Sequence, residues 1–281
     1  MNVSPYIKLI RPSQWVKNAL LFFPPFLNGD LLQPGMLSRS VFPLFSFCFA
    51  SSSVYILNDI FDAQNDSQHP FKKFRPIPAG EIKIRFASLL GVFLLFSAIA
   101  IGYRVSSFFL ICLIAYLVIN TAYSIKLKEY VILDLFCISA GFLLRLQAGG
   151  EAFGVVLSNW LFLSVFLLSL FLSTGKRLAE KKNLGINAGI HRKSLIDYPD
   201  GFLDGTMNMT GAAVLVTYTM YILERHTLLS TIPLCTYGIL RYTLRVKSGV
   251  DGDPTESLLK DPQLFSVSLL WVIMIGLNIY G

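Results

Sequence analysis

The sequence predicts an all-α polytopic membrane protein, a single domain over residues 1–281 built as a bundle of about nine transmembrane helices. Of its 281 residues, 54% are hydrophobic and only 15% are charged, whereas about a quarter of the residues in a soluble domain are charged. The apolar residues also come in long blocks instead of short amphipathic ones. Blocks of this kind are typical of helices that cross a bilayer.

The apolar blocks place the expected spans along the chain. The first span is weak because Pro24 and Pro25 interrupt it, and the eighth is shortened by Pro233. We expect spans near Trp15–Asn28, Val41–Leu57, Phe86–Tyr103, Ser107–Tyr123, Val131–Ala148, Ser158–Ser173, Thr206–Leu223, Leu228–Leu244 and Leu264–Tyr280.

The positions of the cations predict the orientation of these spans. If the N-terminus is cytoplasmic and the spans alternate, most of the 24 Lys and Arg residues fall in the inner segments. The outer loops then hold only Arg39, Arg104 and Arg225. This bias is the positive-inside pattern. The net charge of +7 is therefore explained by an inner rim of cations and does not require a nucleic-acid partner.

The most informative polar segment, Asn58–Gly80, connects the second and third expected spans. Asn58, Asp62 and Asp66 recur at i, i+4 and i+8, so a helix would place their oxygen donors on one face. Asp59 shares that face almost as well, so the set of ligands stays ambiguous. Mg²⁺ prefers carboxylate oxygens and leaves coordination positions open for substrate phosphates. The segment therefore predicts a metal–diphosphate site, with a solvated charged loop as the alternative.

Cations follow these carboxylates and recur in the other inner segments. Lys72 and Arg75 are the expected partners of a diphosphate. A second segment carries Tyr123 and Lys126, and a third carries cations beside a span. The expected phosphate-binding or positioning residues of the third segment are Lys176, Arg177, Arg192 and Tyr198. Lys17, near the N-terminus, either contributes only to the positive-inside orientation of the chain or belongs to the phosphate-binding residues.

Two charged residues sit where a membrane helix makes them costly. Asp134 begins the fifth expected span, so it either completes a metal site or complements the helix dipole as an N-terminal acid. Arg145 lies about three turns further along that span and must face the interior of the bundle. It either pairs with a carboxylate or contacts a phosphate.

With these segments in view, the chain resembles the UbiA superfamily of membrane prenyltransferases, whose Asn-Asp-x-x-Asp-x-x-x-Asp motif it matches at Asn58, Asp62 and Asp66. Within the superfamily it is similar to the decaprenyl-phosphate phosphoribosyltransferase branch. The matching stretches are RPSQWVKN (Arg11–Asn18), HPFKKFRPIPAG (His69–Gly80), YSIKLK with LD (Tyr123–Asp134), GFLLRLQAGG (Gly141–Gly150), GKRLAE (Gly175–Glu180) and RKSLIDY (Arg192–Tyr198).

The resemblance implies Mg²⁺-dependent transfer of 5-phosphoribosyl from phosphoribosyl diphosphate (PRPP) to a polyprenyl (decaprenyl) phosphate, for cell-envelope polysaccharide precursors. It also implies a bacterial cytoplasmic membrane, with the active-site loops on the cytoplasmic side, and leaves open a homo-oligomer. The expected catalytic residues are Asp62, Asp66 and Asp134, and the expected Mg²⁺ ligands are Asn58, Asp62 and Asp66. The expected substrate-binding residues are Lys17, Asn58, Lys72, Arg75, Tyr123, Lys126, Lys176, Arg177, Arg192 and Tyr198.

Two departures from the family pattern bear on this expectation. Aromatic prenyltransferases of the superfamily carry a second Asp-x-x-x-Asp, but here Ile138 stands four residues after Asp134, which weakens an aromatic or other prenyl acceptor as the alternative. Ser67 stands where the branch commonly has Arg, so the sequence departs from the branch at one expected phosphate contact. The other alternative, a lipid-binding or transport protein, is disfavoured because the polar clusters gather at one membrane face rather than at mid-bilayer.

Overall fold

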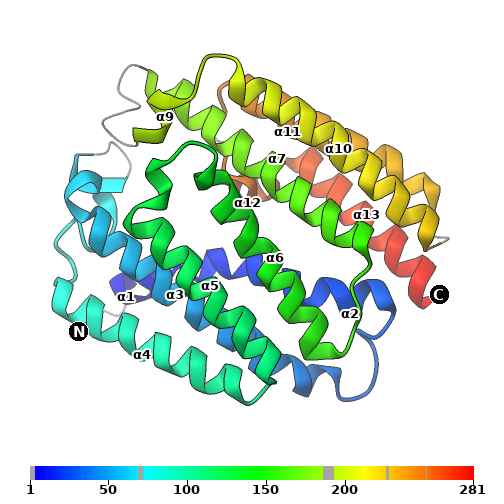
Figure 1. Ribbon diagram of the computed structural model, residues 1–281, viewed down its shortest axis with the longest axis horizontal. Helices are drawn as coiled ribbons and strands as arrows, with labels where there is room; N and C mark the ends of the chain where they lie inside the picture. The colour runs from blue at the N-terminus through cyan, green and yellow to red at the C-terminus, as the bar shows by residue number, and fades with distance from the viewer. Residues whose placement is uncertain (1–3, 69–71, 186–192, 226–227, 251) are drawn as a thin grey trace.

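The computed structural model describes residues 4–68, 72–185, 193–225, 228–250 and 252–281. These residues form helices and connecting turns, with no β-strand among them (Figure 1). The helices are α1 (Ser4–Ile10), η1 (Pro12–Phe22), α2 (Phe23–Asn28), α3 (Met36–Ser67), η2 (Lys72–Phe74), α4 (Ile84–Tyr103), α5 (Ser107–Ile125), η3 (Leu127–Glu129), α6 (Leu133–Phe153), α7 (Asn159–Leu184), α9 (Lys193–Asp197), α10 (Phe202–Glu224), η5 (Leu229–Thr231), α11 (Ile232–Lys247), α12 (Pro254–Lys260) and α13 (Pro262–Tyr280).

Six of these helices are long and apolar enough to cross a membrane: α3, α4, α5, α6, α7 and α13. They confirm the all-α polytopic class and six of the expected spans. The other three expected spans are helical at the predicted places but fall outside that set of six. The first consists of η1 and the six-residue α2, which has Pro24 and Pro25 in its first turn, and α11 has only 16 residues. Whether these segments and α10 also cross the membrane stays a prediction.

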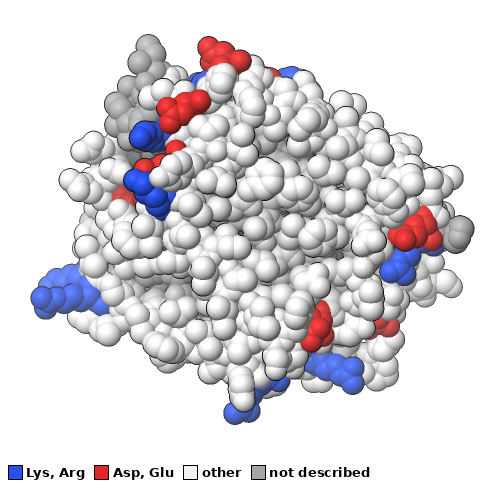
Figure 2. Space-filling model, in the orientation of Figure 1, with Lys and Arg blue, Asp and Glu red and all other residues white. Residues whose placement is uncertain are grey.

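Charged side chains lie toward the edges of the molecule in the face that Figure 2 shows, and a broad uncharged area crosses its middle. Many large apolar side chains are exposed; on α4, for example, Leu89, Phe93 and Phe96 each have about two thirds of their surface accessible (67%, 66% and 65%). Exposed apolar area of this extent suits contact with lipid. The chain is a multi-pass membrane protein.

The core positions the N-terminal segment against the centre of the bundle. Phe47 on α3 packs edge-on against Phe109 on α5, with ring centroids 5.6 Å apart. Leu21 on η1 belongs to the same buried cluster. Gly149 on α6 lies so close to η1 that a Cβ there would come within 2.2 Å of the Leu21 carbonyl oxygen. This close approach holds η1, which carries Lys17, directly against α6.

The end of α3 that carries the Asp motif lies near several short elements. In Figure 1, α9 and η3 lie on the same side of the bundle as this end of α3 and the N-terminus. α1 and η2 pack on α3, and α9 packs on η3 and α7. On the other side of η1, α12 packs between η1 and α13. These contacts bring the three polar segments of the sequence to one end of the helices.

Candidate active site

Two carboxylates from the last turns of α3 converge on one arginine. Asp59 and Asp66 are two helical turns apart and share a face of α3. A single atom, Nη1 of Arg75, lies 3.0 Å from Asp59 Oδ1 and 2.5 Å from Asp66 Oδ2. Arg11 also pairs with Asp59, and Lys72 Nζ lies 4.0 Å from Asp66. Asp59, which the spacing had left as an ambiguous member of the set, is therefore part of the same charge cluster as Asp66.

Asp62 is held by a different cation. Lys128, from η3, pairs with Asp62 Oδ1. Lys126, the residue that the sequence singled out, instead pairs with Glu129 at 3.3 Å and is 62% exposed. It lines a surface cavity of about 480 Å³ beside α9. Because η3 is a 3₁₀ turn, side chains two positions apart point in different directions, and it is Lys128 that reaches the Asp motif.

The donors expected for Mg²⁺ are oxygens, but the protein alone does not form a closed cage. Asn58 is half-buried one turn before Asp62. Among the described residues, no group of three or more His, Cys, Asp or Glu side chains is arranged to hold a metal ion. Mg²⁺ is often held by one or two carboxylates and completes its shell with water and substrate phosphates. The oxygens of Asn58, Asp62 and Asp66 fit such an open site by their chemistry.

Asp134 belongs to a buried network at the start of α6. It is fully buried, its Oδ2 accepts from Arg177 Nε at 2.9 Å, and its Oδ1 accepts from the Tyr198 hydroxyl at 2.6 Å. Arg177 also donates to Glu180 at 2.5 Å and to the Tyr123 hydroxyl at 2.8 Å. The structure therefore brings Asp134, Arg177, Tyr198 and Tyr123 together, as a network that fixes α5, α6 and α7 around the site.

Two non-glycine residues of the described chain have positive φ, and both lie at this site. Arg11 (φ 56°) contacts the Asp motif, and Ile132 (φ 69°) precedes α6. Such a conformation costs about 1–3 kcal/mol and persists only where neighbours enforce it. The Ile132 N–H donates to the Tyr198 hydroxyl at 2.8 Å. Burial and the Asp134 acceptor raise the pKa of Tyr198, so the phenol stays neutral and holds the strained turn in place.

A third cluster joins η1, α7 and α12. Lys176 Nζ lies 2.9 Å from Asp253 Oδ2, and Lys17 interacts electrostatically with both residues. Asp253 Oδ1 accepts from the backbone N–H groups of Thr255 and Glu256, so this carboxylate also caps α12. Burial opposes ionisation of Asp253, but Lys176 and Lys17 outweigh it and lower its pKa to about 2.

Arg145 is 4% exposed, and the acceptors of its hydrogen bonds are neutral groups. Its Nε donates to Asn18 Oδ1 at 2.8 Å, and its other nitrogens donate to the Gly141 carbonyl and the Tyr116 hydroxyl, each at 2.9 Å. Its guanidinium also lies 4.5 Å from the centre of the Tyr116 ring. The sequence had left two alternatives for Arg145, pairing with a carboxylate or contact with a phosphate. Among the described residues, the partners of Arg145 are neutral and none of them is a carboxylate.

Sequence reasoning missed several residues of these clusters. Arg11 and Lys128 lie in the quoted motifs, but nothing in their local pattern shows that they reach α3. Asp253 is absent from the expected residues, although Asp-Pro-Thr-Glu is a helix-start signal with an acid at the cap and Glu three residues later. Arg192, one of the expected positioning residues, lies outside the described residues.

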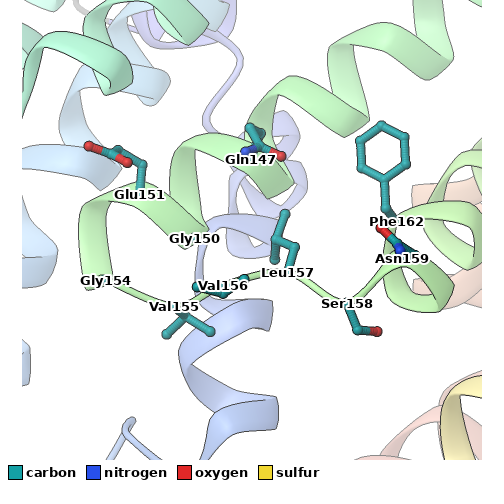
Figure 3. Close-up of a pocket in the computed structure, with 10 residues that line it drawn as sticks. All are labelled: Gln147, Gly150, Glu151, Gly154, Val155, Val156, Leu157, Ser158, Asn159 and Phe162. Carbon is teal, nitrogen blue, oxygen red and sulfur yellow. The ribbon is translucent and has the colours of Figure 1, made fainter. Parts of the chain in front are cut away.

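A second surface cavity, of about 460 Å³, opens at the opposite end of α6 (Figure 3). Gln147 and Glu151 come from α6, Asn159 and Phe162 come from α7, and residues 154–158 connect the two. Glu151 lies about 25 Å along the helix from Asp134, at 1.5 Å per residue. This cavity is therefore separate from the candidate active site.

The sequence profile of the UbiA prenyltransferase family matches residues 23–270. The chain belongs to this family. The resemblance inferred from the Asp motif and the neighbouring basic segments is thereby confirmed, and the buried network around Asp134 lies within the matched region.

Within the UbiA family, the chain is similar along nearly its whole length to decaprenyl-phosphate phosphoribosyltransferases. The decaprenyl-phosphate phosphoribosyltransferase of Mycolicibacterium smegmatis is 34% identical to this chain over 297 residues, which cover 99% of this chain and 93% of that protein. The decaprenyl-phosphate phosphoribosyltransferase of Corynebacterium glutamicum is 33% identical over 287 residues, which cover 98% of this chain and 86% of that protein.

Solved structures agree on the fold. A UbiA homolog from Archaeoglobus fulgidus, bound to GPP and Mg²⁺, superposes with a TM-score of 0.76 at 20% sequence identity, covering 98% of this chain and 99% of that one. At this identity the likeness concerns the fold alone.

Proposed function

We propose that this UbiA-family protein transfers 5-phosphoribosyl from PRPP to a polyprenyl phosphate such as decaprenyl phosphate, releasing diphosphate. Similarity to decaprenyl-phosphate phosphoribosyltransferases along nearly the whole chain carries this proposal. The site geometry supports it, because the Asp-motif carboxylates are interleaved with Arg11, Lys72, Arg75 and Lys128. A substrate pair with a diphosphate and two phosphate groups requires such a density of cations.

This reaction and a prenyl transfer both require stabilisation of the negative charge that develops on a leaving diphosphate. The C1–O bond between ribose and diphosphate breaks, positive charge develops on the ribose as an oxocarbenium-like ion, and both bonding electrons leave with diphosphate. An oxygen of the lipid phosphate then forms the new bond to C1. This acceptor is already anionic and needs no strong base. Stabilisation of the departing diphosphate is therefore the main contribution that the site has to make.

The residues of α3 and η2 have the chemistry for that contribution. Asn58, Asp62 and Asp66 would hold Mg²⁺, which when bound supplies positive charge to the diphosphate oxygens. With Asp66 serving as a metal ligand, its contact with Arg75 would be given up. Arg75 and Lys72, which lie against Asp66, would then be in position to donate hydrogen bonds to the diphosphate. Lys128 remains beside Asp62 and adds to the positive field.

The proposal extends to the surroundings of the enzyme. The bias of cations supports a location of the Asp motif on the cytoplasmic side of a bacterial cytoplasmic membrane, where PRPP is available. The apolar surfaces of the long helices provide lipid contact for a polyprenyl chain. A product of this kind, polyprenyl-phosphoryl-5-phosphoribose, suits the synthesis of cell-envelope polysaccharides.

One transfer assay tests the proposal against its alternatives. The purified protein in detergent is incubated with Mg²⁺, PRPP radiolabelled in the ribose, and decaprenyl phosphate, and the lipid phase is counted. Labelled lipid that disappears with EDTA is the expected result. No label in the lipid, together with turnover of a prenyl diphosphate and an aromatic acid, would instead show an aromatic prenyltransferase. No turnover of either pair would favour a binding or transport protein.

A further inference from the structure

A group of three cations lies apart from the Asp motif and is only partly neutralised. Lys17 makes no hydrogen bond or ion pair with the described residues and interacts electrostatically with Lys176, Asp253 and Arg145. Lys176 pairs with Asp253, and its side chain is still 33% exposed. The third cation, Arg145, has only neutral partners in the described chain.

The charge of Arg145 cannot be removed by deprotonation, because a guanidinium keeps its proton in proteins. A buried charge without a counter-ion is costly, especially inside a membrane. Glu180 on α7 and Asp134 at the start of α6 share Arg177, and Glu180 also interacts electrostatically with Lys176. Among the described residues, Asp253 is the carboxylate that forms an ion pair with one of these three cations, Lys176.

We propose that Lys17 and Lys176 form a second anion subsite that takes a phosphate monoester, with Arg145 behind them and Asp253 fixing Lys176 in place. A phosphate monoester carries nearly two negative charges at neutral pH and presents oxygen acceptors to two lysines, so its chemistry suits this group of cations. Lys17 and Lys176 contact the phosphate, since both side chains are partly exposed, whereas Arg145 is buried. The assignment deepens the proposed function, because it rests on a reaction whose substrates carry such groups in addition to the diphosphate.

The subsite is built from elements other than those of the Asp motif. Lys17 comes from η1, Lys176 from α7, and Asp253 from the start of α12. The cations around the Asp carboxylates come from the α1–η1 junction, the η2 segment and η3. Two candidate substrates offer a phosphate monoester: the headgroup of the lipid acceptor and the 5-phosphate of PRPP. Both have the chemistry that the subsite recognises.

Binding of two simple probes without Mg²⁺ tests the subsite independently of transfer. Geranylgeranyl phosphate represents the lipid headgroup and ribose 5-phosphate represents the other source; neither contains a diphosphate. Binding to the full-length protein in detergent is measured by calorimetry for the wild type, Lys17→Gln and Lys176→Gln. Lys182→Gln is the matched control, because Lys182 is an exposed lysine on the same helix as Lys176. Geranylgeraniol, which lacks the phosphate, controls for binding of the prenyl chain.

We expect at least one probe to bind the wild type and to lose about tenfold or more in affinity in both lysine variants, as one charge-assisted contact predicts. Lys182→Gln should match the wild type. Loss confined to geranylgeranyl phosphate assigns the subsite to the acceptor, and loss confined to ribose 5-phosphate assigns it to PRPP. If neither probe binds the wild type, or both bind all variants equally, the subsite is overturned. Loss of probe binding in a protein that fails to transfer phosphoribose would leave the subsite standing and reject the proposed reaction.

Discussion

At the scale of single residues, the site is a set of carboxylates that are each held by a named cation. Arg75 bridges Asp59 and Asp66 through one nitrogen atom, and Lys128 holds Asp62. These pairs hold the carboxylates in place when no substrate is bound. They also mean that a cation must be displaced from Asp66 before a metal can bind there, so the same arginine can serve the apo state and the bound diphosphate.

Replacement of the Asp-motif carboxylates should abolish transfer with little effect on folding. In Asp62→Ala and Asp66→Ala we expect the loss of at least about two orders of magnitude in kcat, because removing a preorganised electrostatic group from a site costs that much. Melting in detergent should change little, since both residues lie in the last turns of α3 and not in its apolar stretch. Asp200→Ala, which removes a fully exposed carboxylate, is the control. Full activity in either variant would remove the residue from the site.

The cations that follow the motif should act mainly through PRPP. Loss of Lys72 or Arg75 should raise the KM for PRPP about tenfold to a hundredfold, as expected for one charge-assisted contact of about 1.5–3 kcal/mol. Lys73→Ala provides a matched control, because Lys73 is the exposed neighbour of Lys72 and lies over the ring of Phe74. Steady-state kinetics with PRPP varied at saturating decaprenyl phosphate measure the effect. Unchanged kinetics in the double variant Lys72→Ala/Arg75→Ala would show that these charges serve topology only.

At the scale of elements, glycines let the helices that carry the site approach one another. Gly252 lies so close to α7 that a Cβ would come within 2.8 Å of the Gly175 carbonyl, and Gly175 itself faces the ring of Tyr242. Tyr242 donates to the Gly252 carbonyl at 2.7 Å. The start of α12 is therefore locked onto the same turn of α7 that carries Lys176, which explains how Asp253 reaches that lysine.

The close contact between η1 and α6 at Gly149 can be tested by adding a Cβ at that glycine. In Gly149→Ala the new Cβ would lie 2.2 Å from the Leu21 carbonyl oxygen, against backbone that cannot rotate away. We expect η1 to shift, the protein to lose about 1–3 kcal/mol of stability through overpacking, and transfer activity to fall because Lys17 and Asn18 move with η1.

Gly205→Ala is the matched control for this variant. Gly205 lies within α10, and a Cβ there would meet nothing within 4 Å. Because Ala is the better helix former, this change should leave stability equal or slightly higher. The measurements are the detergent melting temperature and kcat for each variant. Equal melting temperatures for the two alanine variants would contradict the close approach of η1 and α6.

At the scale of the whole molecule, the features that follow from periodicity and composition, namely the helices and the helical Asp motif, could be predicted from the sequence. The apolar blocks coincide with the observed helices, and the Asp motif lies on a helix as the spacing indicated. Contacts that depend on a turn or on distant packing were not predictable. The choice between Lys126 and Lys128 depends on the 3₁₀ turn η3, and the role of Asp253 depends on contact with α7, 77 residues earlier. The sequence did not show that Arg177 donates to Asp134, Glu180 and Tyr123 in the fold, and its contact with phosphate stays a prediction.

The orientation of the molecule in the membrane is the remaining prediction at this scale. The positive-inside pattern predicts that the Asn58–Gly80 connection faces the cytoplasm and that the α4–α5 connection faces outside. Single cysteines at Lys73, which is exposed beside η2, and at Arg104, which is exposed after α4, report the two sides. The natural cysteines Cys48, Cys112 and Cys137 are buried, so only the half-buried Cys235 needs replacement by Ser. In intact cells, a membrane-impermeant maleimide should label Arg104→Cys and should label Lys73→Cys only after the membrane is opened. Labelling of Lys73→Cys in intact cells would place the Asp motif outside, where no PRPP is supplied, and would overturn both the topology and the donor substrate proposed for this site.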